Sequence, residues 1–522
     1  MTDTLSTLDA QFLHLEDGIS HMHIAGGCVF AGPAPTMDEL SRLIRSKLHL
    51  VPRYRQRVRS VPLGLGRPVW ADDPHFDLDH HLRCVALPRP GDDAAFRALM
   101  GRLMSRELDR DRPLWETWLV EGVEGGRWAL IFKVHHCLVD GVAGSGLLEV
   151  LLDLEPTTDT PPPEPWEPAP ETPGAVKVLS AWAGLARDAA TSSRGLPDAI
   201  RHPATALQAA IPTAQGLAQW VGHLGSTSPL SIDGTIGPRR SWAHADVALH
   251  DVKAVGRAVG ATVNDVILAA VSGGYRDLLT RRGDDVDTAV LRSLVPVSTR
   301  REDGHGVLDN RVSAMLYELP VRTADPVERL RQVQRELGAL KASRMAEAGA
   351  TLTSLGDLAL PAAIATVSRL ASRAMRVLPQ RSINTVITNV PGPQFPLYCL
   401  GREMVGYRPF VPIFHGVRVG TAIISYNGRV FIGVTGDEAT TSEVDVIADG
   451  AVRAVHELRD RISEAPAPVR HRSARPRTPT RGRAVAGAPP AGRHPPRAAG
   501  RQPEHGRGAP SAAGTRVTPA SR

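Results

Sequence analysis

The stretch that decides the fold runs from Trp128 to Leu148 and reads WALIFKVHHCLVDGVAGSGLL. Its first half is an apolar run with the residue types of a buried strand, and this run ends at His135 and His136. A short turn through Asp140 and Gly141 follows, and the apolar pattern after it predicts a helix. Polar groups at the end of a strand, beside a helix N-terminus, are well placed for chemistry in an α/β protein.

A histidine in that position can accept a proton near neutral pH, because its unperturbed pKa is about 6.5. Asp140 lies across the turn from His136 and is placed to fix a tautomer or to brace the loop. Gly141 suits a turn with positive φ and close approach of a ligand to the backbone. Two histidines alone more often have a structural role, but the full HHxxxDG pattern between a strand and a helix favours catalysis.

The rest of the chain predicts a mixed α/β protein in two halves. Apolar runs at His21–Phe30 and Trp128–His135 alternate with helical patterns at Met37–Leu50 and Asp93–Glu107. The acidic, proline-rich stretch Pro156–Pro173 cannot form a helix or a central strand, so we expect a linker there. The second half begins with Ala-rich amphipathic stretches and continues as another α/β pattern.

In the second half, Thr262 caps a predicted helix from Val263 to about Leu279. Strands are expected at Val290–Val295, Val307–Leu319, Ile383–Val390, Thr421–Tyr426 and Val430–Val434. We therefore divide the chain into a first α/β domain at 1–155, a linker with connecting helices at 156–240, a second α/β domain at 241–465 and a disordered tail at 466–522.

The net charge of +6 over 522 residues comes from the tail. Residues 466–522 hold 12 arginines and one acid, which gives +11, so the first 465 residues, with 49 basic and 54 acidic side chains, carry −5. A mildly acidic body does not predict a nucleic-acid-binding protein, and we expect no nucleic-acid partner for it.

Cysteine spacing and hydropathy exclude further classes. The four cysteines, Cys28, Cys84, Cys137 and Cys399, form no CxxC or zinc-like spacing, which argues against a disulfide scaffold and a metal site. The N-terminal residues lack the basic and apolar regions of a signal peptide. No apolar run reaches the length of about 18 residues that spans a bilayer. We expect a cytoplasmic protein whose membrane contact is peripheral.

The segment from His135 to Gly141 resembles the HHxxxDG motif of the superfamily that contains chloramphenicol acetyltransferase and peptide-synthetase condensation domains. Four further segments, spread over about residues 1–460, are similar to the motif set of bacterial wax ester synthase/diacylglycerol acyltransferases and occur in that family's order. They are Leu8-Asp9-Ala10 with Phe12-Leu13, Pro113-Leu114-Trp115-Glu116, Asn264-Asp265-Val266 and Asn389-Val390-Pro391-Gly392-Pro393. The DFGWG motif of plant BAHD enzymes is absent.

This resemblance implies two chloramphenicol-acetyltransferase-like domains with a tunnel between them, which acyl-CoA and a hydroxyl acceptor enter from opposite sides. It implies that His136 is the general base, that His135 supports the loop and that Asp140 is a structural brace paired with an arginine. Arg300, Arg301 and Arg311 remain open as that partner. Acyl-CoA is then a co-substrate, and neither a cofactor nor a metal is expected.

The other matching residues carry weaker expectations. Asn264, near the start of the capped helix, is placed to donate to an oxyanion, although an Asn-Asp pair also commonly decorates a helix start. For Trp115 we favour a packed indole at the start of a strand over a ligand contact. The candidate substrate-binding residues are Pro113, Leu114, Trp115, Glu116, Asp265, Asn389, Pro391, Gly392 and Pro393. We interpret the metal-like run Asp77–His81 as a solvated strand edge and Cys137 as a spacer.

The function we expect is O-acyl transfer from acyl-CoA to diacylglycerol, which makes triacylglycerol, with wax esters as a second product. The acceptor stays open among diacylglycerol, a long-chain alcohol and a polyketide-like diol, and the alternative class is a non-catalytic lipid-body protein that binds lipid. Positions between Leu358 and Leu378 form an amphipathic pattern with Arg369, Arg373 and Arg376 opposite the apolar face. This pattern fits either core packing or attachment to the inner membrane face or lipid bodies.

Overall fold

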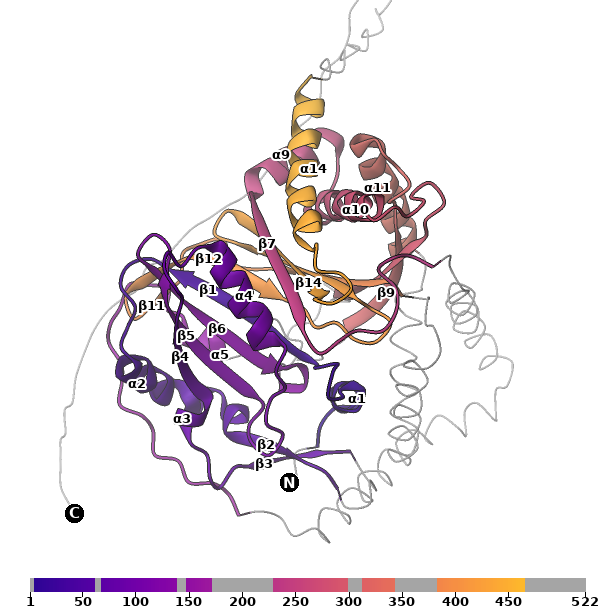
Figure 1. Ribbon diagram of the computed structural model, residues 1–522. Coiled ribbons are helices and arrows are strands. Elements are labelled where there is room, and N and C mark those ends of the chain that lie inside the picture. The colour runs from indigo at the N-terminus through magenta and orange to yellow at the C-terminus, as the bar shows by residue number, and fades with distance from the viewer. Residues whose placement is uncertain are drawn as a thin grey trace, which may run out of the picture. The chain divides into compact units, whose positions relative to one another are not determined.

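The computed structural model describes residues 4–61, 67–138, 147–170, 229–298, 312–342 and 383–464 (Figure 1). Several expectations therefore lie outside the described residues. They are Asp140, Gly141, the arginines at 300, 301 and 311, the amphipathic segments at 175–224 and 358–378, and the tail at 466–522. The chain divides into one compact unit, Met1–Pro466, and a second, Ala467–Arg522.

The first half is built on a six-stranded sheet with the order β11-β12-β1-β6-β5-β4. Its strands are β1 (His23–Phe30), β4 (Leu82–Ala86), β5 (Trp115–Val123), β6 (Arg127–His135), β11 (Tyr398–Cys399) and β12 (Arg402–Phe410). β1 and β5 pair antiparallel with β6, and β4 pairs parallel with β5. β6 is the strand predicted from Trp128 onward, and Trp128, Leu130 and Ile131 are fully buried, as its apolar sequence requires.

The segments before and between these strands form helices and short 3₁₀ turns. The helices are α1 (Thr7–Leu15), α2 (Met37–Lys47), α3 (Leu78–His81), α4 (Asp93–Met104) and α5 (Leu147–Leu151), and the 3₁₀ turns are η1 (Leu48–Leu50), η2 (Pro52–Arg55) and η4 (His136–Leu138). β2 (Gln56–Arg59) and β3 (Val69–Asp72) form a separate antiparallel pair. α2 begins with a complete capping box between Thr36 and Glu39, and Leu40, Leu43 and Ile44 bury one face of it.

The second half has its own six-stranded sheet, with the order β7-β14-β13-β10-β8-β9. Its strands are β7 (Arg240–Ala248), β8 (Leu291–Ser298), β9 (Val312–Leu319), β10 (Thr385–Pro391), β13 (Val419–Tyr426) and β14 (Arg429–Asp437). The helices are α9 (Leu249–Val259), α10 (Val263–Arg281), α11 (Pro326–Ala342) and α14 (Asp445–Glu464). Figure 1 shows α9, α10, α11 and α14 gathered together beside this sheet.

α10 is the central helix of the second half. Thr262 caps it with a complete capping box, which confirms the predicted start, and Val266 to Val271 are all buried. α14 packs closely against it at Gly274, where a Cβ would lie 2.3 Å from the carbonyl oxygen of Ile447. Only glycine allows that approach of the two backbones.

Two strands of the first sheet, β11 and β12, come from the second half of the sequence. β12 pairs antiparallel with β1, with Ala25 opposite Phe410 and Cys28 opposite Tyr407, and β11 continues the sheet beyond it. By their hydrogen bonds, residues 398–410 belong with the first half, although the sequence places them inside 241–465. A strand pattern shows which residues are extended, but it does not show which sheet edge they join.

A second junction joins α4 to β7. A Cβ at Gly101 of α4 would lie 2.5 Å from the carbonyl oxygen of Arg240, so the two backbones touch there. The amide N–H of Arg240 donates to Ser105 Oγ at 2.9 Å, and its guanidinium donates to the carbonyls of Ile19 and Gly237. Arg240 therefore ties the second half to the loop that follows α1.

The described part of the proline-rich linker has no regular structure, as its composition predicts, yet it contacts the first half. Trp166 lies under the guanidinium of Arg55 at 4.5 Å and meets the ring of Phe76 edge-on at 6.1 Å. The amide N–H of Ala169 donates to Asp72 Oδ2 at 3.0 Å. These contacts fix residues 166–169 on the first half.

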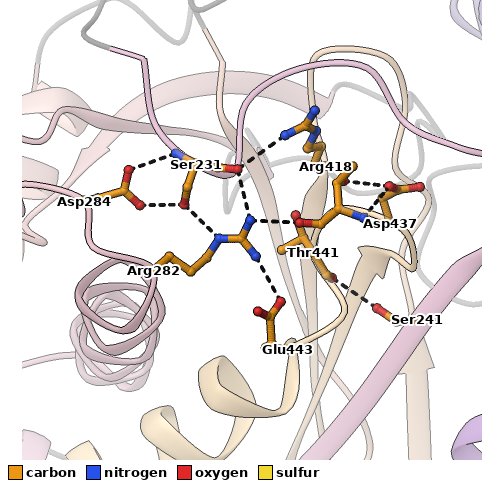
Figure 2. Close-up of polar contacts among 9 residues, drawn as sticks. Ser231, Ser241, Arg282, Asp284, Arg418, Asp437, Thr441 and Glu443 are labelled. Carbon is orange, nitrogen blue, oxygen red and sulfur yellow. Dashed lines mark hydrogen bonds and ion pairs between the residues drawn. The ribbon is translucent and has the colours of Figure 1, made fainter.

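A polar network around Arg282 holds the start of the second half, which follows the linker and connecting segment (Figure 2). Arg282 Nε donates to Ser231 Oγ at 2.9 Å, and its terminal nitrogens donate to Glu443 and to the carbonyl of Thr440, each at 2.9 Å. Asp284 accepts from the amide and the hydroxyl of Ser231. This network fixes the entry of the second half against the end of α10.

The prediction for the run Asp77–His81 is wrong. The residues form α3 instead of a strand edge, and His81 is 1% exposed, stacked on Trp115 at 4.5 Å with its Nδ1 2.8 Å from the Trp115 carbonyl. Because most residues of the run are polar, the sequence does not show that the ring of His81 packs in the core as an aromatic side chain.

None of the described helices is by itself long and apolar enough to cross a membrane. α9 and α10 reach the required length and hydropathy only as a pair, and they meet at an angle of 106°.

Candidate functional site

The histidine pair lies where β6 ends and η4 begins. The amide N–H of His135 donates to the carbonyl of Leu114, and the amide N–H of His136 donates to the carbonyl of Met22, both at 2.9 Å. Backbone contacts from two distant segments therefore hold the pair: the Pro113–Glu116 motif on one side and the residue before β1 on the other.

His135 is fully buried, and its contacts set its tautomer. Its Nδ1 accepts from the amide N–H of Cys137 at 3.1 Å, so the ring proton is on Nε2. Nε2 lies 3.5 Å from Glu16 Oε2, an electrostatic contact longer than an ordinary hydrogen bond. These contacts agree with the supporting role expected for His135.

His136 is half-buried, and its ring stacks on Phe12 with 4.0 Å between centroids and 20° between planes. Burial lowers the pKa of His136 to about 4, outweighing a hydrogen bond to its own backbone, and the neighbouring His135 lowers it further. At neutral pH the ring is unprotonated, which is the state that a general base requires.

Glu16, the C-cap residue of α1, was not among the predicted site residues. Burial raises its pKa, but the close contact with the His135 ring and the charge and hydrogen bonds of Arg110 outweigh burial and lower the pKa to about 2. Its Oε1 accepts from the amide N–H of Met22 at 3.1 Å, and Arg110 Nε donates to Oε2 at 3.0 Å. In the sequence, the signal for Glu16 is its spacing of four residues from Phe12.

The Pro113–Glu116 motif packs behind the histidines. Leu114 is 1% exposed and Trp115 is 2% exposed, and the indole N–H of Trp115 donates to the carbonyl of Tyr54 at 2.8 Å. The packing interpretation of Trp115 is confirmed. Glu116 accepts from the indole N–H of Trp118 at 3.1 Å. A substrate contact for these motif residues stays a prediction.

The structure joins two predicted residues from separate motifs. Asn389 Nδ2, at the end of β10, donates to Asn264 Oδ1, in the first turn of α10, at 2.9 Å. Asp265 is buried and closes the capping box, since its carboxylate accepts from the amide N–H of Thr262 at 2.9 Å. Asp265 therefore has a structural role at this helix start.

The turn at Pro391–Pro393 is fixed against the β13–β14 hairpin. At Gly392, a Cβ would lie 2.3 Å from the carbonyl oxygen of Ser425, so the position requires glycine. The Pro393 carbonyl accepts from the amide N–H of Asn427 at 3.0 Å. The turn thereby fixes the end of β10, where Asn389 lies.

Within the described ranges, no hydrogen bond joins the histidine pair to the asparagine pair, and no group of three metal-ligating side chains occurs. Burial raises the pKa of the Cys137 thiol, which agrees with a spacer and not with a thiolate nucleophile. Asp140 and Gly141, the remaining motif residues, lie outside the described residues.

Two family models match the chain. The wax ester synthase/diacylglycerol acyltransferase catalytic domain matches residues 5–267, and the C-terminal domain of the same family matches residues 308–459. A Mycobacterium tuberculosis protein named "Probable diacyglycerol O-acyltransferase tgs1" is 37% identical over 462 residues, which cover 87% of this chain and 95% of that protein.

Solved structures agree with the family match. The wax ester synthase/diacylglycerol acyltransferase from Marinobacter aquaeolei VT8 is similar with a TM-score of 0.61 and 25% identity, over 88% of this chain and 100% of that one. The first condensation domain of the calcium-dependent antibiotic synthetase shares the fold, with a TM-score of 0.53 and 16% identity, over 90% of this chain and 98% of that one. Two condensation-domain-like halves confirm the predicted α/β fold with two chloramphenicol-acetyltransferase-like domains, and the tunnel between them stays a prediction.

Both family domains, in their expected order, thus accompany the HHxxxDG segment and an unprotonated His136. The chain belongs to the wax ester synthase/diacylglycerol acyltransferase family, and it is an acyl-CoA-dependent O-acyltransferase of that family.

Proposed function

We propose that this acyltransferase moves a long-chain acyl group from acyl-CoA to the free hydroxyl of diacylglycerol, with His136 as the general base. The observation that carries the proposal is the state of His136. Burial lowers its pKa to about 4, so the ring is unprotonated at neutral pH, and it lies at the end of β6 beside η4. The family match identifies acyl-CoA as the acyl donor.

In the proposed reaction, the hydroxyl proton passes to the imidazole of His136 while the hydroxyl oxygen attacks the thioester carbonyl. The tetrahedral intermediate collapses by breaking the C–S bond. The imidazolium then returns the proton to the departing CoA thiolate, so the ring is neutral again and no acyl-enzyme forms. The products are free CoA and triacylglycerol. With a long-chain alcohol as the acceptor, the same steps give a wax ester.

The asparagine pair is our candidate for stabilising the oxyanion. Asn264 Oδ1 accepts from Asn389 Nδ2, so the Nδ2 donor of Asn264 is not used in this contact. A preorganised amide donor of this kind is worth about 3 kcal/mol in the transition state. Two chain segments, α10 and the end of β10, would then orient one donor.

Further parts of the proposal lie outside the described residues. Asp140 braces the histidine loop through one of Arg300, Arg301 and Arg311, and Gly141 supplies the close turn. A tunnel between the two halves brings the substrates together. The site then takes its water-insoluble acceptor from the cytoplasmic face of the membrane or from lipid bodies. Attachment would involve the amphipathic segment 358–378 or the arginine-rich tail.

To test this function, purified full-length protein is incubated with labelled palmitoyl-CoA and, in separate reactions, a diacylglycerol, a long-chain alcohol or a polyketide-like diol. The labelled lipids are then separated. Labelled triacylglycerol formed with release of one CoA per ester supports the proposal. Binding of diacylglycerol without ester formation would contradict it and favour a lipid-binding protein, and ester formed only from the diol would assign another acceptor.

Surface attachment is tested by sedimentation with anionic liposomes. Replacing Arg369, Arg373 and Arg376 with Gln, in chains with and without residues 466–522, separates the two attachment regions. Loss of binding in the tail-less triple variant with an unchanged Tm would support the segment 358–378. Unchanged binding there would exclude that segment, and loss on tail deletion alone would assign attachment to the tail.

A further inference from the structure

Phe12 and Glu16 stand one helical turn apart at the end of α1, and each contacts one member of the histidine pair. Residues four apart on a helix lie on one face. The amide N–H of Glu16 donates to the carbonyl of Phe12 at 3.2 Å, so the helical spacing continues to the C-cap. α1 therefore presents an aromatic ring to His136 and a carboxylate to His135.

The contact of Phe12 covers one face of the His136 imidazole. A stacked ring at 4.0 Å, tilted by 20°, leaves no room for water on that face and limits rotation of the imidazole. A general base needs a fixed orientation toward the hydroxyl that it deprotonates, because small misplacements of reacting groups are costly to the rate.

The contacts of Glu16 reach both histidines. Its Oε2 lies 3.5 Å from His135 Nε2, and its Oε1 accepts from the amide N–H of Met22 at 3.1 Å. The carbonyl of Met22 in turn accepts from the amide N–H of His136 at 2.9 Å. One carboxylate thus holds the ring of His135 and, through Met22, the backbone of His136.

The orientation of Glu16 is itself fixed. Its side chain is 7% exposed, and Arg110 donates to Oε2 through both Nε and a terminal nitrogen. The same terminal nitrogen also donates to the carbonyl of Leu13 at 3.1 Å, which attaches Arg110 to α1. A buried carboxylate with these partners has little freedom to rotate, so the face of α1 is rigid.

We propose that Phe12 and Glu16 are positioning residues that hold His136 in the orientation for proton transfer. Neither residue takes or gives the proton, and both act through the histidine pair. This inference rests on the proposed function, since it assumes that His136 is the base. It predicts that changes at Phe12 or Glu16 lower kcat and leave the KM for acyl-CoA unchanged.

The test is a double-mutant comparison in the full-length chain, with labelled palmitoyl-CoA and diacylglycerol as substrates. Glu16→Gln and Phe12→Leu are each made in the natural chain and in His136→Ala, and kcat, KM and Tm are measured. The matched control is Glu107→Gln, since Glu107 is an exposed carboxylate. In the natural chain, we expect each α1 variant to lower kcat by about 10- to 100-fold, and the control to change nothing.

In the His136→Ala background, neither α1 variant should lower kcat further, because the group that they position is gone. Glu16 also contributes to stability, so Glu16→Gln should lower Tm equally in both backgrounds, which separates folding from positioning. An equal loss of kcat in both backgrounds would overturn the inference, as would unchanged kcat in the natural chain.

Where the activity left in His136→Ala is too small for that comparison, the natural background decides. A higher KM with unchanged kcat would overturn positioning. Failure of the proposed function is seen separately, because His136→Ala alone would then keep normal activity.

Discussion

Asn389 donates its side-chain amide to the side-chain oxygen of Asn264 at 2.9 Å, across 125 residues of sequence. The contact joins the C-terminal part of β10 to the first turn of α10. Two motifs that are separate in the sequence are therefore parts of one arrangement. The contact uses the side-chain oxygen of Asn264, so the Nδ2 group of Asn264 is not taken up by it.

This pair predicts non-additive kinetics. Asn264→Ala removes the proposed donor and should lower kcat by about 10²- to 10³-fold. Asn389→Ala leaves the donor in place but free to rotate, so its effect should be smaller. The double variant should be no slower than Asn264→Ala alone. Steady-state kinetics of the three variants check this, and independent, multiplicative losses would show that the two residues act separately.

The low pKa of His136 predicts an unusual pH profile. Burial holds the folded-state pKa at about 4, so kcat/KM should stay level as the pH falls through about 6.5 and decline only on approach to pH 4. The unfolded chain takes up this proton near pH 6.5, so the contribution of His136 to stability is present above that pH and is lost as the pH falls toward 4. An acid limb of kcat/KM centred near 6.5 would contradict this account.

The network around Arg282 predicts a stability effect without a kinetic one. Arg282→Met removes charge-assisted hydrogen bonds to Ser231, Glu443 and Thr440, and should lower the free energy of unfolding by about 2 kcal/mol. Activity per folded molecule should not change. The control is Arg453→Met, whose pair with Asp277 is about half exposed and should contribute less than about 1 kcal/mol. If urea unfolding gave the same loss of unfolding free energy for both variants, the buried network would contribute no more than the exposed pair, and the prediction would be wrong.

Asp140 is predicted to act through geometry. Asp140→Asn keeps the shape of the side chain but removes the charge that would pair with an arginine. If Asp140 is a brace, Tm and activity should fall together in thermal unfolding and kinetic measurements. A variant that keeps its Tm but loses all chemistry would indicate a direct electrostatic role.

Local patterns predicted the elements that local chemistry determines. α10 begins after Thr262 because the side chains of Thr262 and Asp265 cap each other's backbone N–H groups, and these residues are only three positions apart in the sequence. β6 could be predicted because both faces of the strand are buried, so its sequence is apolar from Trp128 to Val134 except at Lys133. The predicted strands at β8, β10, β13 and β14 are confirmed to within a few residues.

Strand pairing and side-chain contacts between distant parts of the sequence could not be predicted in this way. β12 joins the first sheet through hydrogen bonds to β1, and nothing in its own residues distinguishes that edge from an edge of the second sheet. His81 belongs to the core because Trp115 stacks on it from 34 positions away. Glu16 meets His135 through the tertiary packing of α1 on η4. In each case the deciding partner is distant in the sequence.

The most direct measurement is ester formation by His136→Ala. Purified natural and variant chains are compared with labelled palmitoyl-CoA and diacylglycerol, with folding checked by Tm and with His135→Ala alongside. The account predicts that His136→Ala lowers turnover by about 10²- to 10⁴-fold while the protein stays folded, and that His135→Ala has a smaller effect or one that follows stability. Near-normal triacylglycerol formation by folded His136→Ala would contradict the account.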